Sequence, residues 1–288
     1  MSTHLSQKRT IESQKIANFT GEGAYHGSTQ QRSGAPMPQV VLAPVAEMTP
    51  TTLEQYAAQG REHIDTFDAT FPNMHDIVSA LEIPSQEEIA GDGVTFCWCP
   101  FEEALRLAGP LTRQVLEAMQ AHLEGKKRYV YIDSKIQFFE AGDVPVDSQL
   151  WHVDGTITAR DERVQRLGYN ILHDMRARLQ GDAAPPTYLA YQSSHHCATQ
   201  YVTVPLTFRL PELIPNFEVL DRAVIEANPA TLDQPASSII RFDGLSLHRA
   251  VPAKGEGWRL WVRCIETDRE VHLNTSIIEC YGTVFRTR

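Results

Sequence analysis

The chain has few cysteines, no long apolar run and no excess of positive charge. Five cysteines in 288 residues, an odd number without the spacing of a disulfide framework, favour a reducing compartment. No apolar run follows the basic residues near the N-terminus, and no window approaches the length of a membrane span. We therefore expect no secretory signal, no membrane partner and a cytoplasmic location. The formal net charge of −10 argues against a nucleic-acid partner, because neutralising phosphates requires a basic surface.

The 288 residues are enough to bury a full core, as one large domain or as two small ones. Residues 1–38 are rich in Ser, Gln, Thr and Gly and predict a flexible N-terminal arm. Residues 39–288 are expected to form a single domain, in which 39–127 supply a helical support and 128–288 form a strand-rich core. Within that core, residues 155–186 are expected to form an insertion that overhangs the site as a lid. Arginines of the insertion that are candidates for recruiting an anionic substrate are Arg160, Arg163, Arg166, Arg176 and Arg178.

The local patterns divide the chain into a helical part and a strand-rich part. Apolar residues recur near helical spacing at 50–71, 74–81 and 102–123, with an interruption at Gly109-Pro110. Short β-rich segments are expected at 40–45, 94–98, 129–132, 135–139, 149–154, 187–192, 200–208, 237–242, 258–266 and 277–285. Helical blocks before a dense run of short strands indicate an α+β fold with an antiparallel, sandwich-like core.

A histidine and an aspartate stand two positions apart near the middle of the chain, at His152 and Asp154. If the backbone is extended there, both side chains point to the same face, because a strand has a period of two. An imidazole and a carboxylate on one face can hold two adjacent positions on a metal. The alternative is that His152 hydrogen-bonds within a sheet and Asp154 caps the turn at Gly155.

A second histidine, His248, follows a β-rich run and a turn at Asp243-Gly244. This order of elements is the one that a jelly roll needs to bring a third ligand to the same end of a barrel. His248 follows His152 by 96 residues, and Arg259 follows His248 by 11. Two neutral imidazoles and one carboxylate on one face of Fe(II) leave the remaining positions open.

In these four residues the chain resembles the Fe(II)/2-oxoglutarate-dependent dioxygenases, in the manner of the phytanoyl-CoA hydroxylase-like branch. The resemblance covers roughly residues 128–268. It implies a double-stranded β-helix (jelly-roll or cupin-like) core with N-terminal supporting helices. It also implies that His152, Asp154 and His248 bind Fe(II), and that 2-oxoglutarate and dioxygen are co-substrates at the open positions.

Arg259 has the family spacing for the far carboxylate of 2-oxoglutarate, a role that suits a forked, permanent cation. Arg263 shares its strand face and is a second candidate for that carboxylate or for one on the substrate; the alternative is a salt bridge to a neighbouring strand. Family members often carry a small hydroxyl residue where this chain has Trp261. Tyr188 and Thr199 occupy positions at which the resemblance implies contact with 2-oxoglutarate.

The expected function is therefore an oxygenase that hydroxylates, desaturates or cyclises a small polar molecule. Inward-facing arginines favour a substrate that carries a carboxylate, such as an amino acid or a natural-product intermediate. Because Asp154 occupies the position that is a small residue in related halogenases, halogenation is not expected. Two alternatives remain open: a cupin-like metal-dependent binding module without turnover, and a non-haem iron oxidase that does not use 2-oxoglutarate. The sequence leaves the oligomeric state unknown.

Overall fold

The computed structural model describes residues 39–40, 66–146, 149–154, 172–194, 196–211, 217–270 and 285–286. The arm expected at 1–38 lies outside these residues, as do most of the helix expected to begin at residue 50 and residues 155–171 of the expected lid. The described part confirms an α+β fold made mostly of antiparallel strands. Its sheets do not by themselves establish a closed jelly roll. None of the helices in the described ranges is long and apolar enough to cross a membrane.

A six-stranded sheet forms the larger wall of the molecule, and all its neighbouring strands are antiparallel. Its longest strands are β5 (Tyr129–Phe139) and β13 (Gly257–Thr267), which pair along their whole length. The others are β3 (His75–Ala80), β4 (Cys99–Pro100), β7 (Thr187–Gln192) and β11 (Ser238–Asp243). The strand order is β3-β11-β7-β13-β5-β4.

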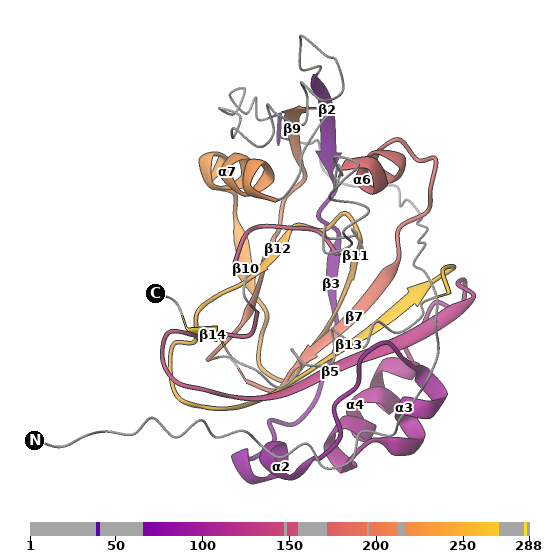
Figure 1. Ribbon diagram of the computed structural model, residues 1–288, viewed down its shortest axis with the longest axis vertical. Helices are drawn as coiled ribbons and strands as arrows, with labels where there is room; N and C mark the ends of the chain where they lie inside the picture. The colour runs from indigo at the N-terminus through magenta and orange to yellow at the C-terminus, as the bar shows by residue number, and fades with distance from the viewer. Residues whose placement is uncertain are drawn as a thin grey trace, which may run out of the picture.

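Three helices cover one face of this sheet: α2 (Gln86–Gly91), α3 (Phe101–Leu107) and α4 (Pro110–Gln120). Figure 1 shows them gathered along the outer side of β5 and β13. Alternate residues of β13, namely Leu260, Val262 and Cys264, pack into a buried apolar cluster with these helices. The period of two therefore turns Arg259 and the other odd-numbered residues of the strand to the opposite face.

The opposite face of the large sheet is lined by polar and charged side chains as well as aromatic ones. Directly paired residues there are Arg263 with Asp133, Trp261 with Lys135 and Arg259 with Gln137. A second sheet lies across from it, formed by β10 (Thr231–Asp233), β8 (Thr199–Val202) and β12 (His248–Ala250). The two sheets touch where the Tyr201 ring lies 5.3 Å from that of Phe242. The candidate ligands lie between these sheets.

The remaining elements form a separate apolar cluster around Trp151 and Val153, the neighbours of His152. A three-stranded sheet in the order β1-β9-β2 contributes to it, with β1 (Gln39–Val40), β9 (Leu206–Pro211) and β2 (Thr66–Phe71). Helices α6 (Leu172–Leu179) and α7 (Glu218–Ala227) pack there as well. A short pair joins β6 (Asp143–Val144) to β14 (Phe285–Arg286).

Two segments expected to be helical are strands. Residues 66–71 form β2, which pairs with β9, and 75–80 form β3, which pairs with β11. Their partners lie far away in the sequence, so tertiary pairing overrides a local apolar spacing that resembles a helix. By contrast, the helical pattern at 102–123 is confirmed, and its break at Gly109-Pro110 separates α3 from α4.

Three expected strands differ in the structure. Residues 94–98 form no strand, because Trp98 adopts a positive φ of 49°, although the Phe96 carbonyl still accepts from the Ser134 amide. Residues 149–154 contain only an isolated bridge, between His152 and His248. The segment 200–208 is divided between β8 and β9, which belong to different sheets.

Candidate metal centre

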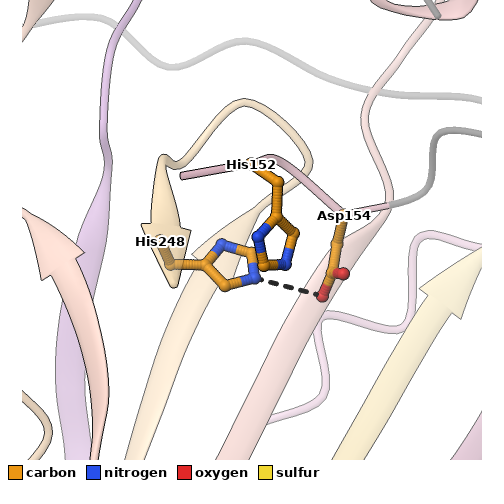
Figure 2. Close-up of side chains that lie close together, drawn as sticks. All are labelled: His152, Asp154 and His248. Carbon is orange, nitrogen blue, oxygen red and sulfur yellow. Dashed lines mark ion pairs between the residues drawn. The ribbon is translucent and has the colours of Figure 1, made fainter. Parts of the chain in front are cut away.

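His152, Asp154 and His248 converge on one point between the two sheets. Each offers one ligand atom, and these atoms all lie within 4.8 Å of one another, so the three residues could hold a metal ion. Backbone hydrogen bonds hold the two histidines side by side, because the amide of each donates to the carbonyl of the other at 3.0 Å. Figure 2 shows both imidazoles directed toward the side on which the Asp154 carboxylate lies.

Each imidazole has its Nδ1 engaged by a backbone carbonyl. Nδ1 of His152 lies 2.7 Å from the Leu150 carbonyl oxygen, and Nδ1 of His248 lies 2.9 Å from that of Ser246. A carbonyl oxygen only accepts, so Nδ1 must carry the proton in both rings. In the neutral rings the lone pair is then on Nε2, which is the tautomer that a metal ligand requires.

His248 is held neutral in this structure. It is buried, and burial together with the neighbouring His152 lowers its pKa to about 4, although Asp154 acts in the other direction. The Nε2 lone pair of His248 therefore faces Asp154 Oδ2 at 3.6 Å. The lone pairs of His248 Nε2 and Asp154 Oδ2 repel each other, and a cation bound between the two atoms would remove that repulsion. This contact therefore favours a metal site over an ion pair.

Asp154 remains ionised despite its surroundings. Burial acts to raise its pKa, but the Arg263 guanidinium and then the two histidines outweigh it and hold the pKa well below the usual range. Arg263 Nη1 donates to Asp154 Oδ2 at 2.5 Å. The site thus presents a carboxylate and two imidazoles, the ligand set of mononuclear non-haem iron sites.

Arg263 makes a cross-strand salt bridge, the alternative role that the sequence leaves open for it. Its Nη2 donates to Asp133 Oδ2 at 2.7 Å while its Nη1 donates to Asp154. Asp133 is fully buried, and its other oxygen accepts from the Trp98 amide at 2.8 Å. Arg263 is therefore tied to two carboxylates at the metal site.

Arg259 is in a different position. Its side chain is 2% exposed, and the only hydrogen bond it makes within the described ranges runs from Nη2 to Gln192 Oε1, at 3.3 Å. Its Nε has no hydrogen-bond partner, and no carboxylate of the described residues forms an ion pair with it. A buried cation without a counter-anion is costly, and an anionic ligand would offset that cost.

Tyr188 and Thr199, the other two expected contacts, each contact a residue that also contacts one of the two arginines or is one of them. Tyr188 is buried, stacks on Phe242 at 4.9 Å between ring centroids and has Arg263 5.6 Å from its ring. The Thr199 amide donates to Gln192 Oε1 at 3.0 Å, the same oxygen that accepts from Arg259. Thr199 is thus connected to Arg259 through one amide side chain.

Three residues at the site were not singled out from the sequence: Asp133, Gln192 and Tyr201. The Tyr201 ring lies 5.6 Å from His248, and burial first, then Asp154, raises the pKa of its hydroxyl, so it stays protonated. Asp133 stands two residues before Lys135 on the same strand, so the two side chains point to the same face. This spacing is a signal from which a carboxylate facing the site could have been predicted. Gln192 and Tyr201 carry no comparable signal in one sequence.

Only part of the expected lid is described. Its Arg178 is buried, and Nη1 donates to the backbone carbonyl of Asp154 at 2.9 Å and to that of Gly244 at 3.4 Å. The first of these contacts holds the backbone of Asp154, a candidate ligand. Arg160, Arg163 and Arg166 lie outside the described residues, as does the side chain of Arg176.

No protein-family model and no curated protein matches this chain. Among solved structures, the chain is similar to the crystal structure of AviO1 from Streptomyces viridochromogenes Tue57, with 12% sequence identity and a TM-score of 0.29. The likeness covers 76% of this chain and 86% of AviO1. At such an identity and TM-score it indicates neither activity nor substrate, so the chemistry of the site must be inferred from its own geometry.

Proposed function

We propose that this protein is a non-haem Fe(II)/2-oxoglutarate-dependent oxygenase that acts on a small, polar, carboxylate-bearing molecule. The observation that carries the proposal is the convergence of one ligand atom each from His152, Asp154 and His248, all within 4.8 Å of one another. Two facing antiparallel sheets with helices on the outer face support a double-stranded β-helix as the scaffold.

The donor set fits Fe(II). Two imidazoles and one carboxylate occupy one face of an octahedral ion and leave the opposite positions for other molecules. Iron bound there would supply the oxidation of the substrate by dioxygen, coupled to decarboxylation of 2-oxoglutarate. The Leu150 and Ser246 carbonyls accept from Nδ1 of the two imidazoles and so direct Nε2 toward the metal, and Arg263 keeps the Asp154 carboxylate ionised.

Arg259 is the proposed partner of the far carboxylate of 2-oxoglutarate. It lies on the same face of β13 as Arg263, four residues away, a span of about 13 Å along a strand. Because Arg263 already pairs with Asp133 and Asp154, Arg259 is the better candidate for a further carboxylate. Gln192 holds its guanidinium from one side.

Aromatic side chains near the ligands would limit the access of water. Tyr201 and Phe242 lie against His248, and Tyr188 stacks on Phe242. All three are buried. A water-poor surrounding favours coupling of dioxygen consumption to the substrate over side reactions.

The expected substrate class follows from the charge on the inner face of the large sheet. Lys135 lies 5.6 Å and Arg263 5.4 Å from the centroid of the Trp261 ring, and both Lys135 and Trp261 are partly exposed. Because Arg263 is already paired with Asp133 and Asp154, Lys135 is the cation here that suits a carboxylate on an organic substrate. A carboxylate-bearing amino acid or natural-product intermediate has these properties.

One anaerobic experiment tests the proposal. Fe(II) and 2-oxoglutarate added together should give a weak visible charge-transfer band, and admitting dioxygen should yield succinate. The band should be lost in Arg259→Met. Fe(II) binding with neither band nor succinate would instead support a cupin-like binding module, and oxygen consumption without succinate would support an oxidase that does not use 2-oxoglutarate.

A further inference from the structure

A chain of polar contacts runs from the backbone amide of Trp98, just before β4, to the carboxylate of Asp154, a candidate metal ligand. The Trp98 amide donates to Asp133 Oδ1 at 2.8 Å, and Arg263 Nη2 donates to Asp133 Oδ2 at 2.7 Å. Arg263 Nη1 then donates to Asp154 Oδ2 at 2.5 Å. Both oxygens of Asp133 are thereby used, and one guanidinium joins two carboxylates.

We infer that Asp133 and Arg263 are positioning residues that hold Asp154 in the orientation required for binding a divalent metal. The inference rests on the metal site of the proposed function but not on the identity of the metal or on 2-oxoglutarate.

The positions of the three side chains explain why this linkage can orient a ligand. Asp133 and Arg263 are directly paired residues of β5 and β13, in the middle of the longest strand pair of the molecule. Asp154, by contrast, follows an isolated bridge and belongs to no regular strand. The linkage therefore ties a ligand from an irregular segment to the most extensively paired part of the sheet.

Burial and charge show why both residues are needed. Asp133 is fully buried, and the Arg263 side chain is 16% exposed. Without Asp133, Arg263 would lose one of its two described carboxylate partners, would pair more strongly with Asp154 and would compete more strongly with an incoming cation. With Asp133 present, the guanidinium charge is shared between two carboxylates, and Asp154 keeps donor capacity for a metal. In metal sites generally, the hydrogen-bond partners of a ligand orient it, and their loss lowers the affinity for the metal.

The experiment uses Co(II) as the probe, with the full chain and without 2-oxoglutarate. Arg263→Lys keeps the charge but loses the fork that spans two carboxylates. The double variant Asp133→Asn with Arg263→Gln removes one charge of each sign, so the local net charge is unchanged, while Asp154 loses the guanidinium that holds it. Both should bind Co(II) about 10- to 100-fold more weakly. Their Co(II) visible spectra should differ from that of the wild type, because the carboxylate ligand is no longer held in place.

The matched control is an ion pair of the same types outside the site. Arg209 donates to both oxygens of Asp68, at 2.9 Å and 3.0 Å, on the exposed surface of the sheet that contains β2 and β9. Arg209→Lys and the double variant Asp68→Asn with Arg209→Gln should leave the Co(II) affinity and spectrum as in the wild type. Circular dichroism of the metal-free proteins separates loss of fold from loss of positioning.

The outcomes are distinguishable. If folded Arg263→Lys and the double variant bind Co(II) with wild-type affinity and an unchanged spectrum, Asp133 and Arg263 do not position Asp154. If instead His152→Ala and His248→Ala retain wild-type Co(II) binding, the metal site itself is wrong and the proposed function falls with it. If the histidine variants lose Co(II) binding while the Asp133 and Arg263 variants keep it, only the positioning role is overturned and the metal site stands.

Discussion

His152 and His248 exchange two backbone hydrogen bonds, each amide donating to the other residue's carbonyl at 3.0 Å, and their ring centroids lie 4.5 Å apart. The two side chains thus start from adjacent backbone positions although 96 residues separate them in the sequence. This bridge brings the two candidate nitrogen ligands together without a regular strand at His152.

Removing either imidazole should abolish tight metal binding. We expect His152→Ala and His248→Ala to weaken Co(II) binding by at least about 100-fold, because loss of one of three protein ligands removes more than a change in the residues that surround them. Titration of the visible Co(II) bands measures this. His122→Ala, a partly exposed histidine beyond α4, is the control and should bind as the wild type does. Wild-type affinity in both site variants would contradict the assignment.

Replacing Arg259 should separate ligand binding from stability. Arg259→Met removes a buried cation that has no carboxylate partner within the described ranges, so we expect the metal-free protein to be as stable as the wild type or more so. In the wild type with Fe(II) under anaerobic conditions, 2-oxoglutarate at about 100 times its Kd should add about 2.7 kcal/mol of stability. The variant should lose that gain in thermal unfolding.

The surface arginine Arg209 provides the comparison for Arg259. Arg209→Met should keep the stabilisation by 2-oxoglutarate, because Arg209 lies in another sheet and pairs with Asp68. A strong loss of stability in metal-free Arg259→Met would show that Arg259 has a structural role instead.

Acidification should destabilise the metal-free protein through His248. Its folded pKa is lowered to about 4, by burial and then by His152, from an ordinary value of 6.5. Below pH 6.5 the unfolded chain takes up a proton there while the folded protein does not, so stability falls as the pH drops from 6.5 to 4. The contribution is on the order of a few kcal/mol. Urea unfolding at several pH values should show a smaller loss in His248→Gln than in the wild type.

Gly109 should be the least replaceable glycine of the helical layer. A Cβ there would lie 1.7 Å from the Asp92 carbonyl oxygen, and Asp92 also accepts hydrogen bonds from the Leu111 and Thr112 amides at the start of α4. Gly109→Ala should therefore destabilise the fold by about 1–3 kcal/mol or more. Gly91→Ala in α2 is the control, because a Cβ added there would meet no atom of the described residues within 4 Å. It should leave the melting temperature unchanged or slightly raised.

Much of the fold could be predicted where local pattern and tertiary pairing agree. The break at Gly109-Pro110 and the shared face of Arg259, Trp261 and Arg263 follow from proline chemistry and strand periodicity, and the structure confirms both. The strands at 66–71 and 75–80 could not be predicted in this way, because their partners β9 and β11 lie more than a hundred residues away.

The sequence by itself determined which residue types are available for the site. Two histidines, an aspartate and two arginines stand at positions from which period-two geometry can bring them to one side of a strand-rich core. These residues, together with the family resemblance, predict a metal centre at His152, Asp154 and His248, and the structure brings the three together so that they could hold a metal ion.

Only the tertiary structure decided how the two arginines differ. They share one face of β13, but the register with β5 places Asp133 opposite Arg263 and the uncharged Gln137 opposite Arg259. Arg263 is therefore paired with carboxylates, and Arg259 is left as a buried cation. The physical reason is that the partner of a side chain depends on strand register, which is set by contacts between segments far apart in the chain.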